Sequence, residues 1–345
     1  MPAFVIQWHV TANCEQKCKH CYMYDSATYE SELKNQLSFK DCLKVLDDFV
    51  ATCRKLNAEP IINFSGGDPL LRKDFFQILE ECKKRRIAFS ILGNPYLVTN
   101  SVAKKLKLLG IKGYQISIDG LEETHDFFRK KGSFKDSLRA FRILKNNRIR
   151  TVCMFTLSKK NAPDLILLIH FLKDKVDVFD FARLVPTGRG KQLKSQIFKP
   201  LEYRDFLLKV LEEYLKLNGK TSTRFGRKDH LWTLLYQDLG LFQPQKDNEL
   251  VQSGCSMGIK HLSILSDGQV MACRRMPLII GKVPEQSLFD IFLNSKELNN
   301  ARKIEKMQKC KDCDLLNYCR GCPAVAFAVT GSYYGLDPQC WKVIE

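Results

Sequence analysis

The chain has 345 residues, and its 55 lysines and arginines against 38 aspartates and glutamates give a formal net charge of +17. It also contains 14 cysteines. Hydrophobic residues make up 45% and charged residues 27% of the sequence, which is typical of a globular protein and excludes intrinsic disorder and collagen-like repeats. The longest apolar run, 324–329, is far shorter than the roughly 18 residues of a membrane span, so we expect no membrane integration.

The first ten residues lack the basic, apolar and small-residue regions of a signal peptide, so we expect a cytoplasmic protein. Thiols stay reduced in that compartment, and many cysteines there indicate metal binding or catalysis rather than disulfides. Basic residues are scattered along the chain, and the longest basic run is Lys83–Arg86. A nucleic-acid, membrane-surface or acidic partner remains open from the charge alone, because no basic tail or block singles one out.

Short strand-like runs alternate with amphipathic helical runs up to about residue 217, at the spacing of a strand plus a crossover helix. This alternation predicts an α/β protein with a parallel sheet. The predicted strands are 4–11, 60–65, 87–92, 113–118, 150–157 and 178–184.

Four cysteines fall within these predicted elements. Ser38 predicts a helix cap, and the apolar face that follows at three- and four-residue spacing includes Cys42 and Cys53. Cys82 lies on the apolar face of the next helix, and Cys153 lies in the fifth strand. We interpret all four as core residues, because a free cysteine commonly behaves as a small buried hydrophobe.

The regular alternation ends before the cysteine-rich tail. The predicted divisions are a barrel domain over 1–217, a bridging region over 218–254 and a small loop-rich domain over 255–345. In the last of these, two β-rich runs flank Asp267-Gly268, which predicts a β-hairpin because this dipeptide tolerates positive φ.

Three cysteines directly follow the first predicted strand, in the spacing Cys14-x3-Cys18-x2-Cys21. Three thiolates provide three corners of a metal site, whereas a closed tetrahedral site needs four. The missing ligand is what an iron–sulfur cluster requires if a small molecule is to reach one iron. A zinc site completed by His20 is the alternative.

This spacing resembles the radical SAM superfamily, whose 4Fe-4S cluster leaves its fourth iron to S-adenosylmethionine. The resemblance implies a partial (β/α)6 TIM-like barrel. It also implies that Gly66, Gly67 and Asp68, at the end of the second strand, hold the methionine part of the cofactor, although the family has Glu where this chain has Asp68. Tyr22 and Ser117 are further cofactor contacts on the same grounds. Three arginines are candidate partners for the cofactor carboxylate, and the sequence does not rank them: Arg129, Arg139 and Arg183.

Seven further cysteines lie between residues 255 and 340, and their short spacings suit either zinc or iron–sulfur clusters. They resemble the SPASM domain, an extension of some radical SAM enzymes that binds two auxiliary iron–sulfur clusters. The resemblance assigns the first auxiliary cluster to Cys255, Cys273 and Cys322. It assigns the second to Cys310, Cys313, Cys319 and Cys340. The Cys319–Cys322 gap is one residue shorter than in the family, and no nearby eighth cysteine completes the first auxiliary cluster.

The resemblance implies reductive cleavage of S-adenosylmethionine to a 5′-deoxyadenosyl radical, with flavodoxin or ferredoxin as reductant. We expect a maturase that oxidises or cross-links (thioether or carbon–carbon) a ribosomally made peptide or protein. Because only 13 residues precede Cys14, a leader peptide would dock on the barrel, the tail or a separate recognition protein. Arg274, where sulfatase-maturing relatives have an aspartate, counts against formylglycine formation.

Two alternatives remain. Decarboxylation of tetrapyrrole (haem precursor) side chains is the first, since the stretch 183–190 also resembles haem-precursor decarboxylases. Its two arginines and those at 274–275 suit carboxylates, whether propionates or an acidic leader peptide. A zinc-stabilised nucleic-acid-binding protein is the non-enzyme alternative, and it lacks interleaved aromatic and basic motifs. Anionic clusters offset part of the excess charge, so we do not expect nucleic acid as a partner.

Overall fold

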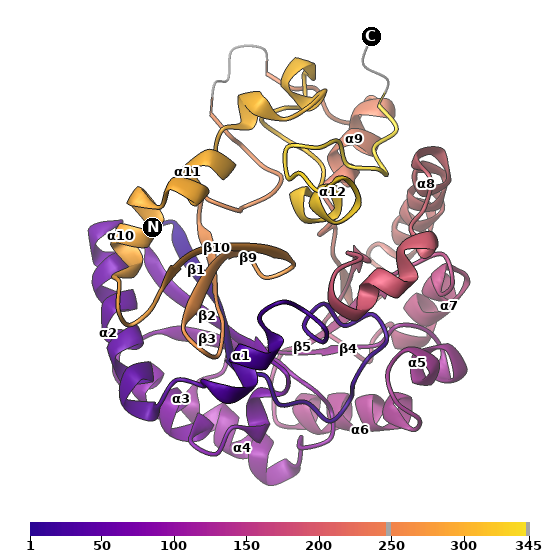
Figure 1. Cartoon of the computed structure of the whole chain (residues 1–345). Helices are drawn as coiled ribbons and strands as arrows, with labels where there is room; N and C mark the ends of the chain where they lie inside the picture. Colours follow the sequence, from indigo (N-terminus) through magenta and orange to yellow (C-terminus); the bar gives the residue numbers. More distant parts are fainter. Residues whose placement is uncertain (246–249, 343–345) are drawn as a thin grey trace.

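The computed structural model describes residues 1–245 and 250–342, and it is built on one ten-stranded sheet in the order β10-β9-β8-β1-β2-β3-β4-β5-β6-β7 (Figure 1). Residues 246–249 of the predicted bridging region and residues 343–345 of the predicted tail lie outside the described residues. The strands are β1 (Ala3–Thr11), β2 (Glu59–Gly66), β3 (Ala88–Leu92), β4 (Tyr114–Ser117), β5 (Thr151–Leu157), β6 (Val178–Arg183), β7 (Arg224–Phe225), β8 (His261–Ile264), β9 (Gln269–Cys273) and β10 (Met276–Lys282).

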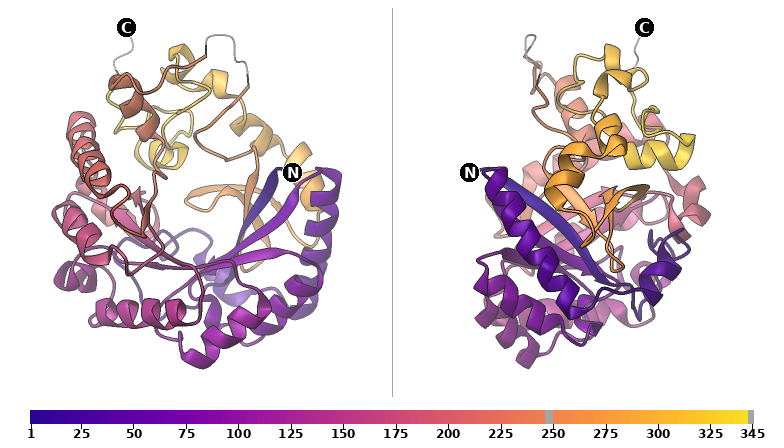
Figure 2. Two further views of the ribbon diagram at one scale, coloured as in Figure 1. Left: turned by 180° about the vertical axis from the view of Figure 1, so that it is seen from behind. Right: turned by 60° about the vertical axis from the view of Figure 1, so that its left-hand side comes forward.

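Helices cover the outer face of this curved sheet and leave its inner face toward the centre (Figure 2). The helices are α1 (Tyr29–Lys34), α2 (Phe39–Lys55), α3 (Phe75–Lys84), α4 (Asn100–Leu109), α5 (Glu122–Phe128), α6 (Ser133–Asn146), α7 (Ala162–Leu172), α8 (Pro200–Leu217), α9 (Leu231–Asp238), α10 (Leu288–Asn294), α11 (Lys296–Ala301) and α12 (Pro323–Thr330). The predicted α/β class and partial TIM-like barrel are therefore confirmed.

The six predicted barrel strands form β1 to β6 and pair in parallel from β1 to β6. Alternation along β1 explains the layering, because Phe4, Ile6 and Trp8 are buried against the helices. Gln7, between Ile6 and Trp8, lines the interior instead. The Ser38 hydroxyl accepts a hydrogen bond from the Asp41 amide at 3.1 Å, so the predicted cap of α2 is present.

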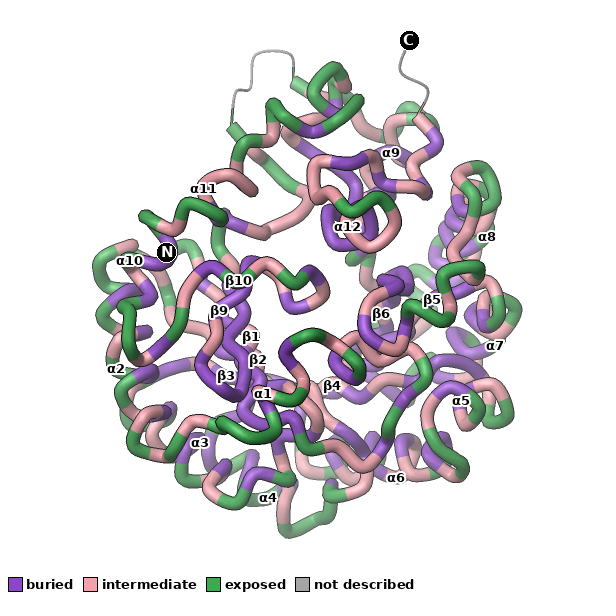
Figure 3. Tube along the Cα trace, in the orientation of Figure 1, coloured by how far each residue is buried: buried purple, intermediate pink, exposed green. Residues whose placement is uncertain are grey.

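Polar residues of the barrel strands, including Gln7 and Ser65, line the inner face of the sheet. The buried layer lies between the strands and the outer helices, as the purple segments of the trace show (Figure 3). Cys42, Cys53, Cys82 and Cys153 belong to this layer and are each at most 1% exposed. These four cysteines therefore pack as core residues, as the sequence predicts.

The predicted hairpin forms between β8 and β9, with Ser263 opposite Met271. It is not confined to the tail, however, because β8 pairs in parallel with β1, Val5 lying opposite His261. The first part of the tail thus extends the barrel sheet beyond β1. At the other edge, β7 from the bridging region pairs with β6. Two strands that the sequence did not predict, β7 and β10, complete the ten.

Within the described ranges, every helix falls short of the length or the apolar character that crossing a membrane requires.

Candidate functional site

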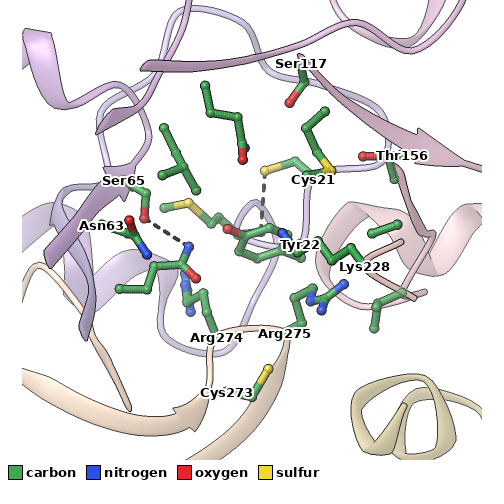
Figure 4. Close-up of a pocket in the computed structure, with 18 of the residues that line it drawn as sticks. Cys21, Tyr22, Asn63, Ser65, Ser117, Thr156, Lys228, Cys273, Arg274 and Arg275 are labelled. Carbon is green, nitrogen blue, oxygen red and sulfur yellow. Dashed lines mark hydrogen bonds between the residues drawn. The ribbon is translucent and has the colours of Figure 1, made fainter. Parts of the chain in front are cut away.

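A cavity of about 720 Å³ occupies the space between the inner face of the sheet, the loop after β1 and the tail. Side chains from three separate parts of the chain converge on it, including Cys21 and Tyr22 from the loop, Ser117 from β4 and Cys273 from β9 (Figure 4). Because the carboxyl ends of parallel strands meet at one edge, residues distant in sequence come together here. The cavity is within the usual size range of small-molecule sites.

The loop after β1 brings Cys14, Cys18 and Cys21 to this cavity. The Asn94 side-chain amide lies 3.3 Å from the Cys14 sulfur, and an Arg129 guanidinium nitrogen lies 3.7 Å from the Cys18 sulfur. The Cys21 sulfur accepts from the Met23 amide at 3.4 Å. Each sulfur therefore faces at least one hydrogen-bond donor, which favours a negatively charged form.

Burial has the opposite effect on the thiols of Cys18 and Cys21. It raises the pKa of Cys18 to about 12, and the nearby Arg129 charge only partly opposes this. It also raises the pKa of Cys21. Thiols in this state ionise when a metal centre supplies positive charge at the sulfur. Three thiols that line one cavity therefore fit an iron–sulfur cluster, in which each cysteine ligates a different iron and one iron is left for another ligand.

Gly66 and Gly67 form a close contact between the end of β2 and the cysteine loop. A Cβ atom on Gly66 would lie 2.2 Å from the Thr11 carbonyl oxygen, and one on Gly67 would lie 1.9 Å from the Asn13 carbonyl oxygen. The Gly67 amide donates to the Thr11 oxygen at 2.8 Å. Both glycines also line the cavity. Because these residues have no side chain, the cysteine loop can pack directly against the end of β2, and a ligand can approach the backbone there.

Asp68 lies beside the cavity but is not among the residues that line it. Its Oδ1 accepts from the Leu70 amide at 3.2 Å, whereas its buried Oδ2 has no partner among the described residues. Burial and the charge of Glu15 raise the pKa of Asp68 to about 7. An unpaired buried carboxylate oxygen next to Gly67 fits an N–H donor such as the amino group of S-adenosylmethionine.

The end of β4 carries two neighbouring polar residues with different roles. Ser117, which the resemblance makes a cofactor contact, lines the cavity (Figure 4). Asp119 is fully buried, and its Oδ2 accepts from Arg129 Nε at 2.5 Å and lies 3.3 Å from His20 Nε2. Although burial opposes it, the Arg129 guanidinium holds the pKa of Asp119 well below its usual range. This network ties His20 to the barrel.

The tail cysteines divide into two groups in space. Cys255, Cys273 and Cys322 line the large cavity together with the N-terminal cysteines. A second, small cavity of about 20 Å³ is lined by Cys310, Cys313, Cys319 and Cys340. Burial raises the pKa of Cys255, to about 12, and neighbouring Cys322 and Cys273 raise it further. Over residues 1–245 and 250–342, no three His, Cys, Asp or Glu side chains converge closely enough to hold a single metal ion.

The arginines predicted to bind the cofactor carboxylate already bind other groups of this chain. Arg183 is buried and paired with Asp229 at 2.6 Å and Asp337 at 2.8 Å. Arg139 donates to the Val98 carbonyl at 3.0 Å and does not line the cavity.

The arginines predicted to bind substrate carboxylates, in the stretches 183–190 and 274–275, also differ in whether an acid of the chain pairs with them. Arg189 is partly exposed, 3.5 Å from Asp25 and outside the cavity lining. Arg274 and Arg275 both line the cavity, but Arg274 pairs with Glu32 at 2.7 Å, whereas Arg275 has no ion pair with any described residue.

Sequence reasoning missed Asn94 and Lys228, which also line the cavity. Asn94 follows β3, so its place after a barrel strand was the available signal. Lys228 lies in the irregular bridging region, where the sequence carries no periodicity that would point inward.

Comparisons with known proteins agree with this geometry. Residues 8–172 match the model of the radical SAM superfamily, and residues 255–323 match that of an iron–sulfur cluster-binding domain known as SPASM. Together the two models cover more than half of the chain. Both imply 4Fe-4S clusters, and the first implies S-adenosylmethionine.

Several curated proteins are similar over nearly the whole chain. An AdoMet-dependent heme synthase of Methanosarcina barkeri is 29% identical over 97% of this chain and 95% of its own. An Fe-coproporphyrin III synthase of the same organism is 28% identical over 99% of this chain and 88% of its own. The mycofactocin maturase MftC of Mycolicibacterium smegmatis is 24% identical over 97% of this chain and 82% of its own.

Among solved structures, SuiB of Streptococcus suis bound to S-adenosylmethionine superposes with a TM-score of 0.78. The match covers 99% of this chain and 78% of that protein at 17% identity, so it demonstrates the shared fold. The fold, the converging cysteines and both family matches lead to one conclusion. The chain belongs to the radical SAM superfamily of enzymes and carries a C-terminal SPASM iron–sulfur cluster-binding domain.

Proposed function

We propose that this enzyme removes carbon dioxide from the propionate side chains of a tetrapyrrole. The observation that carries the proposal is the cavity of about 720 Å³, which the N-terminal cysteines share with three tail cysteines. Such a chamber suits a compact small molecule, whereas a peptide is more often bound along an open groove or sheet edge. Two relatives that align along nearly the whole chain are named as haem and Fe-coproporphyrin III synthases.

In this proposal the large cavity contains S-adenosylmethionine and two of the clusters, and the small cavity contains the third cluster. The domains are a barrel over 1–217, a bridging region over 218–254 and a tail over 255–345. Cys14, Cys18 and Cys21 hold the cluster that binds S-adenosylmethionine. Around that cofactor, the proposed contacts are Tyr22, Gly66, Gly67, Asp68 and Ser117. The proposed auxiliary-cluster ligands are Cys255, Cys273 and Cys322 for the first cluster and Cys310, Cys313, Cys319 and Cys340 for the second.

When bound, these groups supply a 5′-deoxyadenosyl radical to remove a hydrogen atom from the substrate and an acceptor for one electron. The residues of the chain bind and orient the cofactor and the substrate, and they exclude water from the site. Asp68 offers its unpaired oxygen to the cofactor's amino group, and the Gly66-Gly67 backbone lets the cofactor lie close to β2. The tail forms part of the cavity wall, because Cys255, Cys273 and Cys322 line it together with barrel residues. A flavodoxin or ferredoxin is the proposed reductant.

The test is an anaerobic assay with the reconstituted enzyme, a low-potential reductant, S-adenosylmethionine and Fe-coproporphyrin III. The expected result is formation of 5′-deoxyadenosine together with a product lighter by carbon dioxide and two hydrogen atoms for each side chain converted. A Cys18→Ala variant is the control, because it should lose both products while the tail clusters remain. 5′-Deoxyadenosine without any change in porphyrin mass would reject the tetrapyrrole and keep the radical chemistry.

Peptide modification, which the sequence favoured, is the second candidate. Its support is the similarity to the maturase MftC along nearly the whole chain, at lower identity than the haem synthases. The structures of relatives with peptides bound share the fold only. The same assay with a ribosomal peptide encoded beside the gene separates the two candidates. A modified peptide and an unchanged porphyrin would favour maturation.

A further inference from the structure

A two-residue turn of arginines connects β9 to β10, where Cys273 lies opposite Met276. Arg274 points to one side of this turn, and Glu32 holds its guanidinium at 2.7 Å. Arg275 points into the cavity (Figure 4). Its guanidinium has no ion pair or side-chain hydrogen bond to any residue in 1–245 or 250–342. The turn thus uses one arginine for its own anchoring and leaves the other free.

Lys228 reaches the same part of the cavity from the bridging region (Figure 4). Its backbone amide donates to Asp180 Oδ1 at 3.2 Å, and the Gly226 amide donates to the Phe179 carbonyl at 2.8 Å. These bonds hold the segment along the edge of β6. The Lys228 ammonium has no ion pair with an acidic side chain of the described chain.

Arg275 and Lys228 thus carry like charges on the lining of one cavity. Lys228 is exposed and Arg275 is partly exposed, and neither pairs with an acidic side chain of the described residues. Both charges therefore remain available to an anion that enters the cavity. We propose that Arg275 and Lys228 bind a carboxylate of the substrate, as an anchor at the tail end of the cavity. This inference rests on the proposed tetrapyrrole function and names the group that the enzyme recognises.

The position of the anchor determines how a substrate lies. Ser117 is on the far side of the cavity from Arg275 (Figure 4). A propionate held by Arg275 and Lys228 leaves the rest of the ring to extend toward the N-terminal cysteines. A second propionate then faces the cofactor site. The enzyme is therefore selective for tetrapyrroles with at least two carboxylates, one held and one converted.

An alternative role for the two cations is charge balance, because, although burial opposes it, Cys322 and Cys273 raise the pKa of Arg275 and so lie within range of its charge. Thiolates of a cluster would attract Arg275 whether or not substrate is present. The two roles differ in one measurable respect. Only carboxylate binding depends on whether the ligand carries free acids.

The experiment compares binding of coproporphyrin III and of its tetramethyl ester to the reconstituted holoenzyme, by absorption titration. The variants are Lys228→Met and Arg275→Met, with Lys228→Arg and Arg275→Lys as charge-preserving partners. Arg227→Met is the matched control, because Arg227 is exposed and stacks 5.7 Å from the Tyr236 ring, outside the cavity lining. Each neutralising variant should weaken binding of the free acid about 10- to 100-fold. Binding of the ester should stay unchanged.

The outcomes separate the possibilities. Loss of affinity for the acid alone, with partial recovery in Lys228→Arg, supports the anchor. Equal loss for acid and ester, with altered electron paramagnetic resonance of the tail clusters, assigns the cations to charge balance and overturns it. Wild-type-like binding in both Met variants also overturns the anchor but leaves the tetrapyrrole function standing. If wild-type enzyme binds neither porphyrin, both the anchor and the proposed function fail.

Discussion

Asp68 shows how a single side chain reports on the cofactor site. Its Oδ1 caps the short 3-10 helix Pro69–Leu71, as an ordinary turn residue would, and this use is visible in the sequence. Its Oδ2 is buried without a partner, which is costly and therefore points to a ligand. A shorter side chain than the family's glutamate still presents one free oxygen. Asp68 thus has two roles, since one oxygen caps the turn and the other remains available to the cofactor.

The raised pKa of Asp68, about 7, predicts a pH dependence of S-adenosylmethionine binding. Below pH 7 the carboxyl group is protonated and loses the charge that attracts the N–H groups of the cofactor's amino group, so affinity should fall by up to about tenfold per pH unit. Equilibrium dialysis of the reconstituted enzyme between pH 5.5 and 8.5 measures this acidic limb.

Asp68→Asn should weaken binding at pH 7.5 and remove the acidic limb, while Asp68→Glu should restore it. Glu80→Gln, at an exposed position on α3, is the control and should leave the profile unchanged. An unchanged acidic limb in Asp68→Asn would show that another group binds the cofactor's amino group.

At the scale of elements, the end of β2 and the loop after β1 form one unit. The parallel pairing of β1 with β2 continues past the strands, since the Gly67 and Asp68 amides donate to the Thr11 and Asn13 carbonyls at 2.8 Å. This contact places the cysteine loop at a fixed height above the barrel. Any side chain at Gly67 would push the loop away.

Gly67→Ala should therefore displace the loop, because the new Cβ would lie 1.9 Å from the Asn13 oxygen. We expect loss of the N-terminal cluster alone, that is about four iron atoms per chain, and loss of 5′-deoxyadenosine formation. Iron and sulfide analysis after anaerobic reconstitution provides the count.

Gly110→Ala is the control for that change. Gly110 has a φ of +87° and no neighbour within 4 Å of the added Cβ, so its replacement costs only about 1 kcal/mol of backbone strain. Full iron content in Gly67→Ala would contradict the close-contact role.

At the scale of the whole molecule, one buried arginine connects barrel, bridge and tail. Arg183 ends β6, and its guanidinium pairs with Asp229 of the bridge at 2.6 Å and with Asp337 of the tail at 2.8 Å. Asp337 also accepts from the Cys322 amide at 2.8 Å. The position of a tail cysteine thus depends on a barrel strand. This explains why Arg183 is not available for a ligand.

Arg183→Met should leave two buried carboxylates without their partner, at a cost of about 3–5 kcal/mol. For a chain of this size, that lowers the melting temperature by roughly 4–7 °C. Differential scanning calorimetry of the anaerobic holoenzyme measures the shift.

Arg204→Met serves as the comparison, because Arg204 pairs with Asp238 at 3.0 Å in a more exposed setting. Its loss should cost less than about 1 kcal/mol. A similar melting temperature for both variants would show that the Arg183 network does not stabilise the assembly of the three parts.

The sequence by itself determined the α/β class, the six barrel strands, the cysteine loop and the four core cysteines. These features depend on local periodicity and on short spacings, which a chain carries whatever its tertiary contacts. The two groups of tail cysteines also followed from family resemblance, and the structure places each group at one cavity. Peptide modification was favoured over tetrapyrrole chemistry, and the relatives reverse that order.

Only the tertiary structure decided which charged groups remain available. Arg183, Arg274 and Arg275 are alike in sequence, yet the first two are neutralised by acids far away in the chain and the third is free. It also joined the tail hairpin to β1, since edge pairing depends on contacts between distant segments. The net charge of +17 therefore does not show by itself which cations can bind a ligand. The fold decides this, because only a cation that lacks an acidic partner remains available.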